Sequence, residues 1–192
     1  VEIIDPRQDP RRERYAQSYF EMRWRHGVTE HVSRRRMQDP IYFGNMMVHA
    51  KDADGLIAGL TMSYPETIRP SLQIHHTLPH ISRAAGIYLL LFEDRMIFIG
   101  DTTVNQDPNA AQLAEIAWMA GHIAQHYFET TPRIAMLSYS NFGSNLDERS
   151  SKVREAVHIA RERWPELIIE GEMQADSAVD VTIAREAFPL SK

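Results

Sequence analysis

The stretch Pro132–Ser144, which reads PRIAMLSYSNFGS, decides the fold of this chain. Its apolar part, Ile134–Leu137, follows a proline and is typical of a buried strand in a parallel sheet. Small polar residues and a glycine come next, and a helical pattern begins near Arg149. Ligands commonly bind where a strand, a polar loop and a helix follow one another, with anionic groups near the helix N-terminus. The stretch is therefore either an anion- or nucleotide-binding loop with free backbone and side-chain donors, or an ordinary connection between a strand and a helix.

The composition narrows the class of protein. The 192 residues are 43% hydrophobic and 24% charged, as in ordinary globular proteins. The net charge of −5 favours neither nucleic acid nor a membrane surface as a partner. The absence of cysteine excludes disulfides, thiolate ligands and cysteine nucleophiles. No apolar run is long enough to span a bilayer, and we expect a cytoplasmic protein.

Both ends of the chain have sequences that look like parts of a folded domain. The first residue is Val1, and the last residues follow Phe188-Pro189-Leu190 directly. We therefore expect residues 1–192 to be one region of a longer polypeptide, without its N- and C-terminal portions.

Periodicity and capping residues predict an alternation of helices and strands. Helices are expected at 11–26, 29–38, 41–50, 67–76, 109–128, 149–163 and 177–187. Strands are expected at 56–60, 134–137 and 167–169, and as a hairpin of 86–92 with 96–100. Asp107 is expected to cap the longest helix, and Pro70 to lie in the first turn of its own helix. The pattern predicts an α/β fold, with a layered mixed sheet flanked by helices.

Polar residues follow several of the predicted strands. The groups are 63–69, 101–105, 138–144 and 170–176, and they would line one cleft if the strands were neighbours. Arg69 could clamp a phosphate or a carboxylate there, or it could form a surface salt bridge with Glu66. His122 and His126 are interpreted as surface histidines, and no metal site is predicted.

Six blocks of the sequence, taken in order, resemble the phosphate acetyltransferase (phosphate acetyl/butyryl transferase) family. They are Tyr19–Gly27, Phe43–Gly59, Glu66–Gln73, Ile99–Ala117, Pro132–Ser144 and Gly171–Ala178. The resemblance is closest to the C-terminal acetyltransferase-like domain of bacterial hybrid NADP-dependent malic enzymes. It implies a two-domain architecture like that of isocitrate and isopropylmalate dehydrogenases, with the site between the domains.

The resemblance also implies a set of ligand-binding residues. Two family arginines that hold phosphate and the phosphates of coenzyme A correspond to Arg23 and Arg69. Acetyl-CoA or phosphate is expected to contact these arginines and the polar residues Ser63, Ser138, Ser140, Asn141, Gly143 and Ser144.

The chain departs from the family pattern at two positions near these residues. Tyr64 stands where a small hydroxyl residue is usual, and Phe142 stands where a lysine is usual. The sequence Ser140–Ser144, SNFGS, is similar to the hybrid malic enzymes. The acidic residue that is proposed as the family's base has no counterpart in this chain, so no catalytic residue is assigned.

These departures favour an acetyl-CoA-binding regulatory domain without transacetylase activity. Its partner would be a malic enzyme catalytic domain of the same polypeptide, which would convert malate to pyruvate with NADP and Mg²⁺ or Mn²⁺ outside this chain. The alternative is an active phosphate acetyltransferase, and a third class is a structural oligomerisation module. Because relatives are dimers or larger, we also expect a homo-oligomer, for which helix 109–128 and the hairpin could supply contacts.

Overall fold

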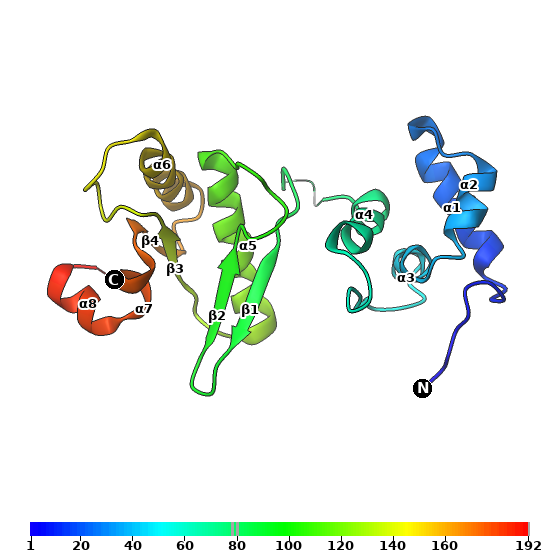
Figure 1. The fold of residues 1–192 in the computed structure, drawn as a ribbon, viewed down its shortest axis with the longest axis horizontal. Coiled ribbons are helices and arrows are strands. Elements are labelled where there is room, and N and C mark those ends of the chain that lie inside the picture. Colours follow the sequence, from blue (N-terminus) through cyan, green and yellow to red (C-terminus); the bar gives the residue numbers. More distant parts are fainter. Residues whose placement is uncertain (78, 80, 192) are drawn as a thin grey trace. The chain divides into compact units, whose positions relative to one another are not determined.

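The structure is a computed structural model that describes residues 1–77, 79 and 81–191. The chain divides into two compact units, Val1–Leu78 and Pro79–Lys192 (Figure 1). Each unit has its own hydrophobic core. Among the described residues, no helix combines the length and the apolar character that crossing a membrane requires.

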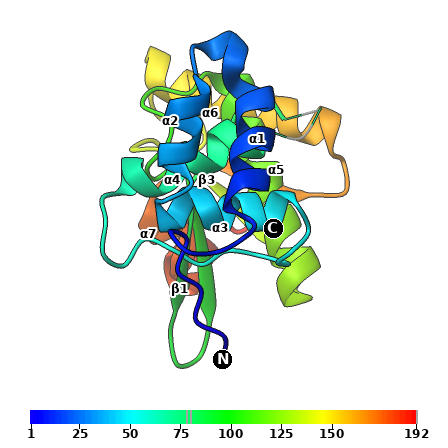
Figure 2. The ribbon, with the colours of Figure 1, turned by 90° about the vertical axis from the view of Figure 1, so that its right-hand side faces the viewer.

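The first unit is helical. Its helices are α1 (Arg12–Arg23), α2 (Glu30–Arg36), α3 (Pro40–His49) and α4 (Tyr64–Ile74), and the short 3₁₀ turn η1 (Trp24–His26) follows α1. Helices α1 and α2 lie side by side (Figure 1, Figure 2). The core contains Tyr15 and Tyr19 of α1, Phe43 and Met46 of α3, and Ile74 of α4.

Local sequence signals set most of the helix ends in this unit. Gly27, with φ of +80°, ends η1 in the left-handed conformation that glycine adopts most readily. The Thr29 side chain accepts a hydrogen bond from the Val32 amide at 3.3 Å and caps α2. Asp39 caps α3 in the same way, and Pro40 occupies its first position. These helices confirm the sequence-based predictions.

Two predictions for the first unit are wrong. Residues 56–60 form no strand, and Ile57 and Leu60 are almost fully exposed because no neighbouring strand covers them. Helix α4 begins at Tyr64, since the Glu66 carboxylate accepts hydrogen bonds from the Ser63 amide and hydroxyl before its first turn. Pro70 therefore lies inside α4 instead of in the first turn.

The second unit combines helices with two small sheets. Strands β1 (Ile87–Leu91) and β2 (Met96–Gly100) pair antiparallel, and β3 (Arg133–Leu137) and β4 (Ile168–Met173) pair parallel. The helices are α5 (Ala110–Phe128), α6 (Glu148–Arg163), α7 (Ala175–Val179) and α8 (Val181–Ala187). The α/β fold and the hairpin are confirmed. Within the described residues, however, the strands form two separate sheets instead of one mixed sheet.

The core of the second unit lies between α5, α6 and the β3–β4 pair. Ala114 and Ala117 of α5 face Ala156 and Ala160 of α6, and Met136 packs among them from β3. Small residues on both helices allow the two backbones to approach closely. This core holds the carboxyl end of β3 beside the start of α6, where the polar loop of residues 138–147 connects them.

The cap of α5 differs from the prediction. The Asn109 side chain accepts from the Gln112 amide at 3.0 Å, and the Gln112 side chain accepts from the Asn109 amide at 2.9 Å. This reciprocal pair satisfies two backbone donors at the helix start. Asp107 instead forms an ion pair with Lys152 of α6 at 2.7 Å.

Candidate functional site

The structure places the expected ligand-binding residues in both units. Arg23, Ser63 and Arg69 belong to the first unit. The second unit holds the five residues of the polar loop, which are Ser138, Ser140, Asn141, Gly143 and Ser144. Within the second unit, the loop meets residues 172–174, which confirms part of the expected clustering of polar groups.

Arg23, at the end of α1, forms no hydrogen bond or ion pair through its side chain with the residues that the structure describes. Its Nε is buried and makes no hydrogen bond to any described residue. A buried guanidinium N–H is costly unless an acceptor reaches it, so this group is suited to binding an anion or a water molecule. Its charge is close enough to act on Tyr19, whose pKa is raised by burial against the opposing charges of Arg36 and Arg23.

Arg69 lies exposed on α4 and also makes no hydrogen bond or ion pair within the described part of the chain. The salt bridge with Glu66 that the sequence allowed does not form. Glu66 is engaged by the Ser63 hydroxyl at 2.7 Å and the Ser63 amide at 2.9 Å. These two bonds lower the pKa of Glu66 despite partial desolvation, and the charge of Arg69 adds to the effect. The Ser63 hydroxyl is thus used by Glu66, while the Arg69 guanidinium has no hydrogen-bond partner among the described residues.

Arg23 and Arg69 each lie four residues from one partner of a hydrogen bond that joins α1 and α4. The Tyr19 hydroxyl donates to Gln73 Oε1 at 2.9 Å. Arg23 lies four residues after Tyr19, and Arg69 lies four residues before Gln73. Residues four apart share one face of a helix, so each arginine is one turn away from this bond.

A buried carboxylate organises the polar loop of the second unit. Glu172 of β4 is 0% exposed. Its Oε1 accepts from the Gly143 amide at 2.7 Å and from the Ser140 hydroxyl at 3.2 Å. Arg154 of α6 donates from Nε to Glu172 Oε2 at 3.0 Å. The expectation of free donors in this loop is therefore wrong for these groups, because an acidic side chain of the same unit accepts them.

Other loop groups are also bonded internally. The Asn141 side chain accepts from the Gln174 amide at 2.7 Å and donates to the Gln174 side chain at 3.1 Å. The Ser144 hydroxyl accepts from the Asn141 amide at 3.1 Å and lies 3.1 Å from the Ser140 hydroxyl. Contact of these loop residues with a ligand stays a prediction.

Sequence reasoning missed Glu172 and Arg154. The available signal was weak, because β4 reads IIEGEM and its two glutamates look alike in the sequence, although only a buried one needs a partner for its charge. Burial alone raises the pKa of the Glu172 carboxyl, but the hydrogen bonds from Arg154, the Gly143 amide and Ser140 outweigh it. The net pKa is lower than usual, so the carboxylate is ionised at neutral pH.

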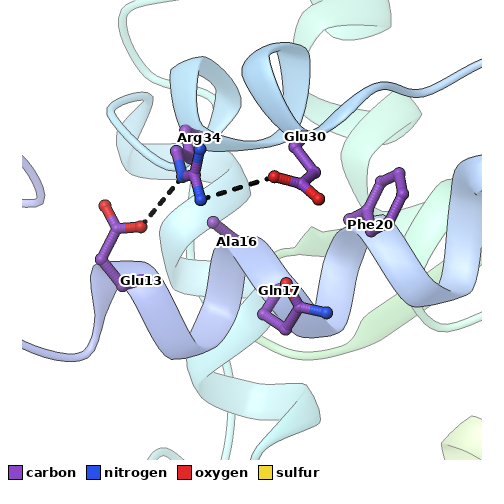
Figure 3. A pocket seen from close by; sticks show the side chains of 6 residues that line it. All are labelled: Glu13, Ala16, Gln17, Phe20, Glu30 and Arg34. Carbon is purple, nitrogen blue, oxygen red and sulfur yellow. Dashed lines mark hydrogen bonds and ion pairs between the residues drawn. The ribbon is translucent and has the colours of Figure 1, made fainter.

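The hollow between α1 and α2 contains none of the expected residues (Figure 3). Arg34 points between Glu13, at 3.1 Å, and Glu30, at 3.6 Å, so two carboxylates already neutralise its charge. A second hollow in the same unit is bordered by Thr67 and Ser71 of α4, and by Asn45 of α3. It therefore lies beside the helix that carries Arg69.

Comparison with known proteins gives consistent matches. The model of the family described as "Phosphate acetyl/butaryl transferase" matches residues 1–192. The "Phosphate acetyltransferase" of Synechocystis sp. is 44% identical over 191 residues, which are 100% of this chain and 27% of that relative. Among solved structures, the EutD phosphotransacetylase from Staphylococcus aureus is 35% identical with a TM-score of 0.85, over 100% of this chain and 59% of that one. A phosphotransacetylase from Streptococcus pyogenes is 36% identical with a TM-score of 0.86, over 98% of this chain and 57% of that one.

The lengths of the aligned proteins differ. This chain spans 27% of the Synechocystis relative and somewhat less than three fifths of the two solved chains. The family model nevertheless matches residues 1–192 of this chain, and the two solved structures align with 100% and 98% of it. The chain therefore belongs to the phosphate acetyl/butyryl transferase family.

Proposed function

We propose that this chain is part of a phosphate acetyltransferase, which transfers an acetyl group between coenzyme A and phosphate. The observation that carries the proposal is the pair of arginines, Arg23 and Arg69, that have no anionic partner among the described residues. Family membership supports the same activity. Acetyl-CoA and phosphate are accordingly the proposed substrates.

The arginines have a defined task in this reaction. A phosphate oxygen attacks the thioester carbonyl carbon, the new C–O bond forms, the C–S bond breaks, and coenzyme A leaves as its thiolate. Arg23 and Arg69 would bind phosphate groups through charge-assisted hydrogen bonds and stabilise the negative charge of the transition state. In the reverse direction a base must remove the thiol proton, and no residue of this chain is assigned that role.

The regulatory malic enzyme hypothesis has less support than the transacetylase. The relatives compared above are named phosphate acetyltransferase or phosphotransacetylase. None of these names supports a malic enzyme domain, NADP or a divalent metal ion as a partner of this chain. A cytoplasmic location and a homo-oligomer stay predictions.

The activity is tested with the full-length protein that contains this chain. Thiol release from acetyl-CoA is followed with and without phosphate, and we expect phosphate-dependent turnover. Binding of acetyl-CoA without turnover would instead support the regulatory hypothesis. Absence of binding in calorimetry would support an oligomerisation module.

The role of the arginines is tested by Arg69→Gln and Arg23→Gln. Each change removes a charged donor, and we expect kcat/KM for phosphate or acetyl-CoA to fall by about 10- to 100-fold. Arg35→Gln is the matched control, because Arg35 is an exposed arginine of α2 whose side chain bonds to no described residue. Equal kinetics of all three variants and the parent protein would contradict the proposed clamp.

A further inference from the structure

The donors of the polar loop converge on an anion, and that anion belongs to the chain itself. The Gly143 amide and the Ser140 hydroxyl point to one oxygen of Glu172, at 2.7 and 3.2 Å. The Phe142 amide donates to the backbone carbonyl of the same residue at 2.8 Å. Three groups of the loop, from Ser140, Phe142 and Gly143, are thus attached to a single residue of β4, which is fully buried.

Arg154 completes the arrangement from α6. Its Nε and NH2 nitrogens donate to the two oxygens of Glu172 at 3.0 and 3.3 Å. The same NH2 group donates to the carbonyl of Asn145, at the far end of the loop, at 3.1 Å. Arg154 therefore connects α6, the carboxylate and the loop, and its side chain is 38% exposed.

The negative charge of the buried Glu172 carboxylate explains why its donors are held firmly in place. A buried carboxylate is stable only when charged or polar donors satisfy it, and removal of one member leaves the others unpaired. The loop has residues in unusual backbone conformations, with φ of +44° at Phe142 and +87° at Gly143. Such conformations persist when surrounding bonds determine them. At this position the Glu172 carboxylate holds the Gly143 amide, and the Glu172 backbone carbonyl holds the Phe142 amide.

We infer that Glu172 and Arg154 are positioning residues, which fix the loop 138–145 from inside while Ser140 and Gly143 shape the site instead of gripping the substrate's anion. The inference rests on the proposed function for its effect on catalysis. Its effect on the order of the loop is independent of any substrate. This assignment revises the earlier expectation for Ser140 and Gly143, whose donors are directed to the chain's own carboxylate.

The chain offers a matched control on the same helix. Arg161 lies two turns after Arg154 on α6 and donates from Nε and NH2 to the Ile169 carbonyl at 3.0 and 2.8 Å. Both arginines thus connect α6 to β4 with side-chain hydrogen bonds. Only Arg154 does so through a carboxylate that also holds the loop, so the two variants separate general attachment from positioning.

The test measures amide hydrogen exchange of the full-length protein without substrate, for peptides that contain residues 138–146. In Glu172→Gln, the amide NH₂ group would face either Arg154 or the Gly143 amide and leave that donor unpaired, and we expect exchange in the loop to become about 10- to 100-fold faster. Arg154→Lys keeps the charge but loses the paired donors, so it is expected to show a smaller acceleration. Arg161→Met should leave loop exchange unchanged, even where it lowers the melting temperature. Unchanged loop exchange in Glu172→Gln and Arg154→Lys would overturn the inference.

Kinetics then test the catalytic consequence. We expect Glu172→Gln and Arg154→Lys to lower kcat/KM for phosphate-dependent thiol release by about 10- to 100-fold, because small misplacements of a site are costly, and Arg161→Met to change it little. If the parent protein shows no turnover, the proposed function is rejected. Faster loop exchange in the variants would still support the positioning role in that case. Faster exchange with unchanged kinetics, in a protein that does turn over, would overturn the claim that the loop shapes the site.

Discussion

The Tyr19 hydroxyl of α1 donates a hydrogen bond to Oε1 of Gln73 on α4, at 2.9 Å. The Tyr42 hydroxyl of α3 donates to the same oxygen at 3.0 Å and Arg36 of α2 donates to it at 3.5 Å, so one amide oxygen joins four helices of the first unit. Tyr19 is fully buried, and its ring is part of the core. The proposed arginine clamp is built on α1 and α4, and this bond therefore fixes its supports.

The first prediction concerns Gln73→Leu. The substitution removes the oxygen that accepts from the Tyr19 and Tyr42 hydroxyls and from Arg36, and we expect the free energy of local opening of α4 to fall by about 1–3 kcal/mol. Native-state hydrogen exchange of α1 and α4 measures this quantity. Gln17→Leu serves as the control, because the exposed Gln17 side chain bonds, among the described residues, to Glu21 of its own helix alone, and its effect should stay within about 0.5 kcal/mol. Equal effects of the two substitutions would contradict the role of Gln73.

The second prediction concerns the titration of Glu172. Its pKa is lowered in the folded protein, so the unfolded chain binds more protons in the pH range just below the ordinary glutamate pKa. The stability that Glu172 contributes is then present above about pH 4 to 5 and is lost as the pH falls through its folded pKa. Carbon-13 NMR of the labelled glutamate carboxyl measures the pKa directly, and Glu172→Gln should remove this part of the acid sensitivity. A pKa at or above the ordinary value would contradict the arrangement with Arg154.

The third prediction concerns Asp101, which follows β2. Its Oδ1 is buried without a hydrogen-bond partner among the described residues, and burial raises its pKa, with Lys152 opposing and Asp107 adding to the shift. A raised pKa destabilises the ionised form in the fold, so stability falls as the pH rises through the folded pKa. Asn also adopts positive φ readily, and φ here is +59°. We expect Asp101→Asn to raise the melting temperature at pH 7 by about 2–4 °C, and the gain to disappear below the ordinary aspartate pKa.

Asp107→Asn is the control for the same measurement, because the pKa of Asp107 is lowered whereas that of Asp101 is raised. Asp107 is highly exposed and pairs with Lys152 at 2.7 Å, and this hydrogen bond lowers its pKa. Its substitution should leave the melting temperature unchanged or slightly lower. A lower melting temperature for Asp101→Asn at neutral pH would show that the Asp101 charge is stabilised by groups outside the described interactions.

The fourth prediction concerns Gly171→Ala in β4. A Cβ atom at this position would lie 2.5 Å from the Met136 carbonyl oxygen and 3.0 Å from the Met136 Cβ, and φ is +134°. Because the nearest atom is backbone of the paired strand, relief requires the two strands to separate. We expect a loss of at least about 2 kcal/mol, seen as a lower melting temperature. Gly55→Ala is the control, since no atom lies within 4 Å of its Cβ position, and it should have little effect.

The sequence predicted those elements whose signals are local. The hairpin 87–100 was recognised because two apolar β runs flank the turn residues Glu93-Asp94-Arg95. The helix start at Thr29 was recognised because a cap acts on amides two or three residues away. The predicted strand 56–60 failed for the opposite reason, since a strand requires a partner that its own residues do not specify.

The residues of the candidate site also differ in whether the sequence could identify them. Arg69 was singled out from its place beside a polar loop and Arg23 from a family resemblance, and the comparisons confirm the family. Glu172 was not identified, although it decides the hydrogen bonding of the predicted loop. Its partners Arg154, Gly143 and Ser140 lie 18, 29 and 32 residues away in the sequence.

The amino-acid sequence by itself determined the presence of most helices, the cap of α2, the hairpin and the family, because caps, turns and motif blocks act over a few neighbouring residues. Only the tertiary structure decided that the Glu172 carboxylate is buried and that it occupies the donors of the loop. The burial of a charge depends on which distant donors the fold brings to it, and the free energy of that arrangement is a property of β3, β4 and α6 together.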